Sequence, residues 1–488
     1  MSKFNWSSHR SSPSMEAAAV TQPLLTPASS AISTTKLVQT IPRFTYHHFS
    51  SILLSSGCKN PPQFLAYCSA KSSINNGNAT NESSAAEQPT LDSRIPRQAV
   101  PTSSEAVPSN LSFSRGLVFD LGSKNSWDGL EIGSPVVKRY LSDEEERWYM
   151  WYYGTCSENS GCDSIGLAVS SNGVHWERGT EPVRSNADVG LVMKSSEDWW
   201  AFDTHSIRPC EVSVMSSSKV RANSAVYWLY YTGFKSEKIG AFSHCIPFSF
   251  KNPERVRFGV DNDDQEVTGG EILKSLPGLA MSQDGRHWAR IEGEHHSGAL
   301  LDVGSDGEWD SSFIASPQVV FHSNGDLRMY YYSFDVQTGH FAVGIARSRD
   351  GIRWLKLGKI MGGGAIGAYD ECGIVNPRVS INKKDGRYLM VYEGVALNGK
   401  RSIGMAVSSD GLKNWERLQE CPVFEQSSDG GWDCEGVGMP YLVQMDGNVD
   451  EWRLYYRGIG EGGRSGIGLA VSQGSDAYSF QRWTGFHL

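Results

Sequence analysis

The chain has no continuous run of about eighteen apolar residues, the shortest stretch expected of a membrane-spanning helix. It also has no excess of basic residues, because its 45 Lys and Arg are outnumbered by 54 Asp and Glu, which gives a formal net charge of −9. The first absence predicts a protein without a membrane-spanning helix. The second argues against a general affinity for nucleic acid, which requires a basic surface.

Cysteine is scarce and irregularly spaced. The chain has nine Cys residues, and no two of them form a Cys-x-x-Cys pair, the spacing typical of zinc sites. We therefore expect no bound metal and no other cofactor. Cys156 and Cys162 share one predicted loop, where they could form a disulfide or remain as thiols, and both states stay open at this point.

Acidic residues are nearly absent from the first part of the chain, which is rich in Ser, Thr and Ala. Up to Asn81 the only acid is Glu16, whereas basic residues recur from Lys3 to Lys71. This composition is typical of an organelle transit peptide, and the segment lacks the apolar core of a secretory signal. We expect residues 1–70 to be a transit peptide for the chloroplast stroma, with a disordered tail as the alternative, and residues 71–112 to be a flexible linker.

The rest of the chain, residues 113–488, contains one pattern five times. Each copy opens with an aromatic residue and Asp, followed six or seven residues later by Pro and an apolar strand. The copies are Trp127-Asp128 to Pro135, Phe202-Asp203 to Pro209, Trp309-Asp310 to Pro317, Tyr369-Asp370 to Pro377, and Trp432-Asp433 to Pro440. Such internal repetition is a sign of a repeat architecture.

Every copy continues in the same way. An aromatic strand such as residues 148–154 (WYMWYYG) is followed by a strand of small residues such as 165–170 (IGLAVS). Four copies then have an Asn-Gly or Asp-Gly turn, which is the strongest short-range hairpin signal. Each unit therefore predicts four short antiparallel strands.

Four strands per unit, repeated radially, form a propeller blade. We predict an all-β, five-bladed β-propeller with blades at about residues 113–180, 181–293, 294–358, 359–418 and 419–488, which we call repeats 1 to 5. A β-sandwich with coincidental internal similarity is the alternative.

These repeats resemble the five-bladed propeller superfamily of glycoside hydrolases, which includes arabinanases, levansucrases, invertases and mannoside phosphorylases. The resemblance implies an enzyme that hydrolyses or transfers a glycoside, with acidic residues on the innermost strands, because glycosidic cleavage uses two carboxyl groups. The family often has Asp directly before the Pro. Here those positions are neutral or basic: Ser134, Arg208, Ser316, Asn376 and Met439.

Residues that break the fivefold pattern indicate where a site would lie. The Pro-containing loops and the ends of the aromatic strands share one face of a propeller, so charged exceptions there are candidates. As catalytic residues we expect Glu371 or Glu435 as the acid and Asp203 or Asp310 as the base or nucleophile. As substrate-binding residues we expect His205, Arg208, Glu393, Arg457, Asn376 and Glu131.

The repeated Asp residues have a second interpretation, since an Asp present in every repeat can simply accept backbone N–H bonds in a loop. Two functions therefore stay open. One is a carbohydrate-active enzyme, a glycosidase, glycosyl transferase or phosphorylase, acting on a carbohydrate or sugar phosphate. The other is a noncatalytic propeller that binds a carbohydrate or a protein partner in the plastid.

Overall fold

The computed structural model of the chain describes residues 115–141, 146–156, 162–179, 188–215, 226–239, 249–250, 256–257, 272–323, 325–428, 430–445, 451–474 and 477–485. The predicted transit peptide and linker lie outside these residues. Within them the regular structure is almost entirely β-strand, which confirms the all-β prediction, and η3 at Glu461–Gly463 is a short 3-10 helix. No helix in this part of the chain is long and apolar enough to cross a membrane.

The strands form several sheets, and the pairs within each repeat are antiparallel, as predicted. The sheet of repeat 1 holds β2 (Glu131–Leu141), β3 (Glu146–Thr155), β4 (Asp163–Ser170), β5 (Glu177–Arg178) and β6 (Leu191–Met193). The sheet of repeat 2 holds β7 (Ser206–Met215), β8 (Val226–Ile239), β11 (Ile272–Ser282) and β12 (Ala289–Ile291). A separate pair is formed by β9 (Ser249–Phe250) and β10 (Val256–Arg257).

Repeats 3 and 4 share one sheet, because a single parallel pairing between Phe341 and Gly373 connects them. Its strands are β13 (Ala315–Ser323), β14 (Asp326–Asp335), β15 (His340–Ser348), β16 (Leu355–Met361), β17 (Gly373–Ile381), β18 (Tyr388–Val395), β19 (Arg401–Ser408) and β20 (Glu416–Arg417). The last sheet holds β21 (Gly436–Gln444), β22 (Trp452–Ile459), β23 (Ser465–Ser472), β24 (Phe480–Arg482) and β1 (Leu117–Phe119).

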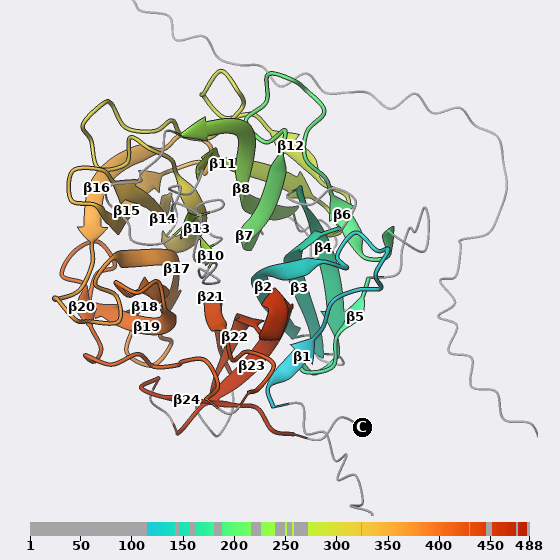
Figure 1. Cartoon of the computed structure of the whole chain (residues 1–488). Helices are drawn as coiled ribbons and strands as arrows, with labels where there is room; N and C mark the ends of the chain where they lie inside the picture. The colour runs from blue at the N-terminus through green and yellow to red at the C-terminus, as the bar shows by residue number, and fades with distance from the viewer. Residues whose placement is uncertain are drawn as a thin grey trace, which may run out of the picture. The chain divides into compact units, whose positions relative to one another are not determined.

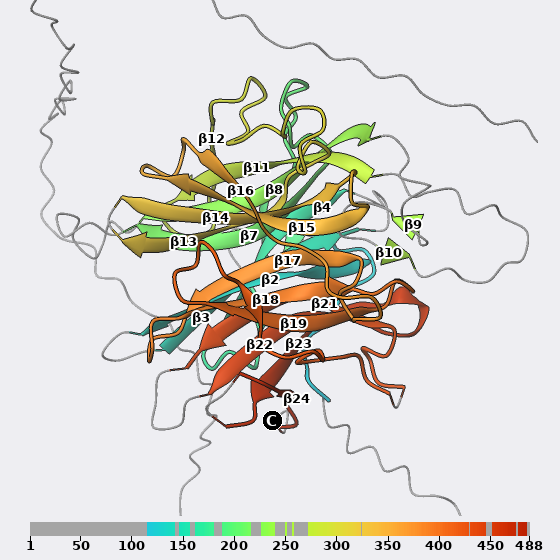
Figure 2. The ribbon, with the colours of Figure 1, turned by 90° about the vertical axis from the view of Figure 1, so that its left-hand side faces the viewer.

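The sheets are arranged around a common centre, as in a propeller (Figure 1). The Pro-containing strands β2, β7, β13, β17 and β21 lie nearest this centre. Each of them contacts the next, and β21 contacts β2, so these inner strands surround one axis. Figure 2 shows the layers from the side, with β14 and β15 above β17, β18 and β19.

The repeated Asp has the same surroundings in every repeat. It is buried and accepts a hydrogen bond from a Tyr hydroxyl of the second strand at 2.9–3.1 Å. In four repeats it also accepts a hydrogen bond from an arginine of the outer strand at 2.7–2.8 Å, and in repeat 3 Asp310 forms an ion pair with Lys356 at 2.8 Å. The groups are Asp128, Tyr152 and Arg178; Asp203, Tyr231 and Arg290; Asp310, Tyr331 and Lys356; Asp370, Tyr392 and Arg417; and Asp433, Tyr456 and Arg482. Burial, reinforced by the carboxylate, raises the pKa of each Tyr, so the phenol stays protonated and donates.

The small-residue strand needs its glycine because the aromatic residue that opens the repeat packs over it. A Cβ on Gly344 would lie 2.2 Å from the Trp309 ring, and one on Gly166 would lie 2.3 Å from the Trp127 ring. The same opening aromatic residue stacks on the Tyr of the second strand, as Trp309 does on Tyr331 at 5.6 Å between ring centres. The repeat sequence is thus a packing pattern.

Neighbouring repeats are joined at the Asx-Gly turns. A donor of the second strand reaches the turn glycine carbonyl of the next repeat, from Trp151 to Gly285, Tyr230 to Gly351, Tyr330 to Gly411 and Tyr455 to Gly173. The fifth junction differs in both partners. Repeat 4 has Val391 in place of the donor, and repeat 5 has Gln473-Gly474 in place of the Asx-Gly turn.

Strand β1 joins the start of the described chain to its end. Leu117 pairs with Gly468 and Phe119 with Ile467 of β23, and the Gly116 carbonyl accepts from the Leu469 N–H at 2.7 Å. The strand that begins the described chain therefore belongs to the sheet of repeat 5. It occupies the part of the β23 edge just before Ala470–Ser472, which pair with β24.

The Pro residues lie at β-bulges in the inner strands. Ser134, Ser316, Asn376 and Met439, each directly before a Pro, have positive φ values of 47–55°. Repeat 2 differs by one residue, because Arg208 pairs opposite Thr232 and the bulge falls after Pro209. Arg208 therefore occupies the strand position that Gly133 has in repeat 1, opposite Tyr153.

Candidate functional site

The inner strands begin, and the second strands end, at the same end of the axis, which we call the Pro-loop end. The register shows this directly, since Glu131 pairs with Thr155, Gly373 with Val395 and Gly436 with Ile459. Side chains from repeats 1, 2, 4 and 5 meet there in a group that we call the central polar cluster: Glu131, Tyr153, Asp163, Arg208, Asn376, Glu393, Arg401 and Arg457.

Glu131 and Arg457 join the first repeat to the last. Arg457 Nη2 donates to Glu131 Oε1 at 2.7 Å, and the Tyr153 hydroxyl donates to the same oxygen at 2.7 Å. The two charged side chains are 15% and 11% exposed, more than the rest of the cluster. This charge-assisted pair is thus held in one geometry at the accessible edge of the group.

Glu393 lies deeper. It is 2% exposed, its Oε1 pairs with Arg401, and its Oε2 accepts from Asn376 Nδ2 and from the Met439 N–H, both at 2.9 Å. A Cβ on Gly438 would lie 2.5 Å from Oε2, so this carboxylate packs directly on the inner strand of repeat 5. A buried carboxylate is tolerated only with such partners.

Arg208 is fully buried on the opposite side of the cluster. Its Nε donates to Asp163 Oδ2 at 2.7 Å, and Thr155 Oγ1 donates to Asp163 Oδ1 at 2.6 Å. The guanidinium lies 4.5 Å from the centre of the Tyr153 ring, which places it beside the Glu131 pair.

Gly133 shows that the two halves of the cluster touch. A Cβ there would lie 2.7 Å from Arg457, 2.9 Å from Tyr153 and 3.1 Å from Met439. Because the Met439 N–H also binds Glu393, the group is continuous across the axis.

His205 lies at the margin of the cluster. Its backbone N–H donates to Phe234 O at 2.9 Å, and its Nδ1 is 3.9 Å from Cys162 Sγ, next to Asp163. The structure does not join Cys162 to Cys156 in a disulfide. The six residues expected to bind substrate therefore lie in or beside one cluster: His205, Arg208, Glu393, Arg457, Asn376 and Glu131.

The four acids expected to be catalytic lie elsewhere. Glu371 accepts from the Gly367 N–H at 2.9 Å and Glu435 from the Gly462 N–H at 3.2 Å, both in loops. Asp203 and Asp310 contact a Tyr hydroxyl and a cation of their own repeats, as the equivalent Asp residues of the other repeats do. In the described ranges, no group of three or more His, Cys, Asp or Glu side chains could hold a metal ion.

Sequence reasoning missed three residues of the cluster: Tyr153, Asp163 and Arg401. Asp163 and Arg401 both stand three positions before the glycine of the third strand, where the other repeats have Ser275, Phe341 and Ser465. The signal was available, since both break the repeat with a charge. Outside the cluster, Trp199 is 86% exposed in the loop that leads into β7 and was also not singled out.

No family model matches the chain, and no curated protein matches it. Among solved structures, a glycosyl hydrolase from Bacteroides ovatus is 15% identical, with a TM-score of 0.48 over 77% of this chain and 95% of that one. A thermostable family-43 glycoside hydrolase is 16% identical, with a TM-score of 0.46 over 72% and 92%. A protein of the GH130 family of mannoside phosphorylases is 14% identical, with a TM-score of 0.47 over 77% and 98%. With identities this low, function is inferred below from the residues of the site.

Proposed function

We propose that residues 113–488 form a five-bladed β-propeller that binds a carbohydrate at its Pro-loop end. The observation that supports this is the central polar cluster, in which ion pairs from different repeats hold carboxylates and guanidinium groups around one axis. A carboxylate only accepts hydrogen bonds and a guanidinium only donates them. A sugar hydroxyl does both, so the paired Glu131 and Arg457 at the accessible edge suit adjacent hydroxyls of a sugar ring.

The hydrogen-bond and ion-pair partners of the acidic residues favour noncatalytic binding over glycoside cleavage. Cleavage needs one carboxyl group that presents a proton to the leaving oxygen and a second on the sugar carbon. Glu131 and Glu393 are each bound to an arginine, and Asp203 and Asp310 tie their own repeats together. These contacts suit fixed charges rather than proton transfer.

We further propose that Trp199 offers an apolar face to the bound sugar. Its exposed indole lies in the loop leading into β7, which begins at the Pro-loop end. Aromatic side chains offer a flat apolar face beside polar groups, as carbohydrate rings require.

The cellular location is a further part of the proposal. The acid-poor, Ser-rich composition up to Asn81 supports import into the plastid stroma. A fluorescent fusion of residues 1–100 should accumulate in plastids, and a fusion that stays in the cytosol would contradict this.

The function is tested by calorimetric titration of the full chain with a panel of mono- and disaccharides. Replacing Glu131 with Gln should weaken binding of the sugar that binds best by roughly tenfold, because one charged acceptor is lost. An exposed loop acid gives the matched control, Asp306→Asn, which should bind like the unmodified chain. Unchanged affinity in Glu131→Gln would refute the site.

Catalysis is tested separately with aryl glycosides. The proposal expects Glu371→Gln and Glu435→Gln to leave sugar binding unchanged. Hydrolysis by the unmodified chain that disappears in either variant would establish the glycosidase function instead.

A further inference from the structure

A second polar site lies at the opposite end of the axis, where the inner strands end. A cavity of about 390 Å³ opens there and is lined by residues of all five Pro-containing strands, β2, β7, β13, β17 and β21. We call it the distal cavity. Its volume is within the range of about 300–1,000 Å³ that is usual for small-molecule sites.

The floor of the distal cavity is built around Glu211. This side chain is 3% exposed, pairs with Lys138, and accepts from Gln318 Nε2 at 3.1 Å and from the Tyr441 hydroxyl at 3.3 Å. Gln318 also binds the Val379 backbone through both its carbonyl, at 2.6 Å, and its amide, at 2.9 Å. The floor therefore connects all five inner strands with polar groups.

The protonation states of the floor follow from this packing. Burial, reinforced by Glu211, raises the pKa of Tyr441 to about 12, so its phenol is neutral at physiological pH. Burial alone would lower the pKa of Lys138, but Glu211 and Tyr441 outweigh it and raise that pKa above its usual value. Lys138 is therefore a cation.

A second cation lies beside the floor. Arg378 is 4% exposed and interacts electrostatically with Tyr441, and its Nη1 donates to Ser316 Oγ at 2.6 Å and Pro377 O at 3.0 Å, both neutral oxygens. Among the residues that line the cavity, Lys138, Arg139 and Lys383 carry positive charges and Glu211 alone carries a negative one, in a chain whose net charge is −9. This local excess of positive charge favours an anionic partner.

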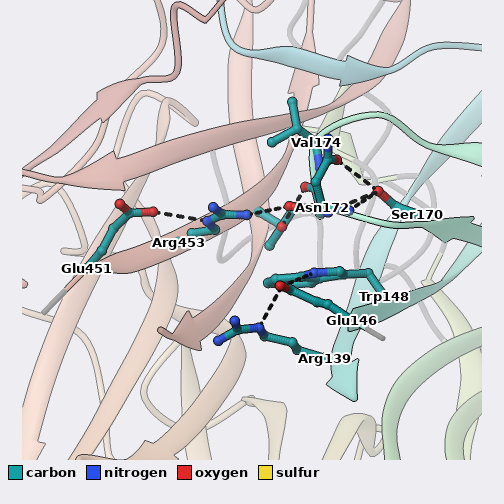
Figure 3. A network of polar contacts seen from close by, with 10 residues as sticks. Arg139, Glu146, Trp148, Ser170, Asn172, Val174, Glu451 and Arg453 are labelled. Atoms are coloured by element: carbon teal, nitrogen blue, oxygen red, sulfur yellow. Dashed lines mark hydrogen bonds and ion pairs between the residues drawn. The ribbon is translucent and has the colours of Figure 1, made fainter. Parts of the chain in front are cut away.

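The rim and walls add further donors. Arg139 on the rim is held by Glu146 at 2.8 Å, and its guanidinium lies over the Trp148 ring, as Figure 3 shows. The walls include Ser213 and Ser380, which carry hydroxyl groups. These groups are suited to a ligand that carries hydroxyls as well as charge.

We infer that the distal cavity is a second binding site and that it takes a small hydroxylated anion, a monosaccharide carrying a phosphate ester or a carboxylate. The anionic group lies toward Lys138, with the charge of the buried Arg378 behind the floor, and the hydroxyls meet the Ser213, Ser380 and Gln444 side chains. This site is separate from the central polar cluster, so the inference does not depend on the function proposed there.

The test is isothermal titration of the full chain with glucose 6-phosphate, glucuronate, glucose and inorganic phosphate. At least one of the two sugar anions should bind roughly tenfold more tightly than glucose, and the one that binds better identifies the anionic group. Equal affinity for glucose, tighter binding of inorganic phosphate than of either sugar anion, or no binding of any probe would overturn the inference.

Two variants are expected to change the affinity for the sugar anion in opposite directions. Lys138→Met should weaken binding of the sugar anion by roughly tenfold, whereas Glu211→Gln should strengthen it, because a repelling carboxylate is removed. Lys413→Met, an exposed lysine away from the cavity, is the control, and Glu131→Gln should leave this binding unchanged. If Lys138→Met fails to fold, Lys383→Met on the exposed rim provides the test, with roughly twofold weaker binding expected. A change in the same direction for Lys138→Met and Glu211→Gln, or no change for Lys383→Met, would refute the site.

Discussion

Replacing Asp203 with Asn removes one negative charge from the interior of repeat 2 while keeping the size of the side chain. Asp203 is fully buried, and its Oδ2 accepts from the Tyr231 hydroxyl at 3.0 Å and from Arg290 Nε at 2.7 Å. Because every repeat has this arrangement, we expect the substitution to lower stability.

The magnitude follows from the two contacts. A hydrogen bond to a charged acceptor contributes about 1.5–3 kcal/mol, and the Tyr231 bond is fully buried. The Arg290 side chain is 35% exposed, so solvent screens that ion pair and it contributes about 0.5–1 kcal/mol. We therefore expect Asp203→Asn to reduce the free energy of unfolding by about 2–4 kcal/mol.

The assay is urea unfolding followed by Trp fluorescence, with sugar binding measured on the same samples. Asp370→Asn, the equivalent change in repeat 4, should cost a similar amount, and the exposed Asp306→Asn should cost nothing measurable. If Asp203→Asn abolished a sugar-cleaving activity while its unfolding curve stayed unchanged, the structural role assigned here would be wrong.

Three further expectations concern the repeats. Gly344→Ala should destabilise by roughly 1–3 kcal/mol in urea unfolding, because its Cβ would lie 2.2 Å from the Trp309 ring. Tyr455→Phe should cost about 1 kcal/mol, through loss of the buried 2.7 Å hydrogen bond to Gly173 O. Burial alone would raise the pKa of Asp326, but hydrogen bonds from two arginines lower it below 3.8. The ionised Asp326 therefore stabilises the folded state above the unfolded pKa of 3.8, and this stabilisation is lost as the pH falls through the folded pKa. The melting temperature should drop in this acid range, and it should drop less steeply in Asp326→Asn.

The glycine and tyrosine substitutions each have a control of the same chemistry. Gly362→Ala adds a Cβ with no atom within 4 Å, and Tyr478→Phe alters a side chain that is 49% exposed, so neither should change stability. Equal effects in control and test variants would show that the packing described above is not the cause. For Asp326, an identical acid profile in the variant would contradict the assigned pKa shift.

The repeats could be read from the sequence because their contacts are local. The Asp, the aromatic strand and the glycine all lie within one repeat and contact one another there, and the Asx-Gly turn is a hairpin signal of its own. The sequence therefore predicted the all-β class and the antiparallel strands, which the structure confirms. Pairing across the chain could not be predicted, as β1 with β23 shows, because many strand edges have similar local sequences.

The residues that break the repeat pattern indicated where the central polar cluster lies, but they did not show which side chains pair with one another. It selected Glu131 and Arg457, which lie 326 residues apart and form an ion pair. It did not reveal that Arg208 is shifted by one residue through the bulge after Pro209, or that Asp163 neutralises it. The spacing from Asp203 to Pro209 is six residues instead of seven, so aligning the repeats on Pro placed Arg208 one position away from its structural equivalent, Gly133.

The sequence alone determined the repeated units, because hydrogen bonds and ring packing within one repeat specify each of them. Only the tertiary structure decided which charges meet on the axis, since Glu393 and Met439, or Lys138, Glu211 and Tyr441, come together only when the inner strands surround a common centre. The distal cavity has no signature in any single repeat. Its polar floor takes residues from five strands, and its charge excess exists only where their side chains share one buried volume.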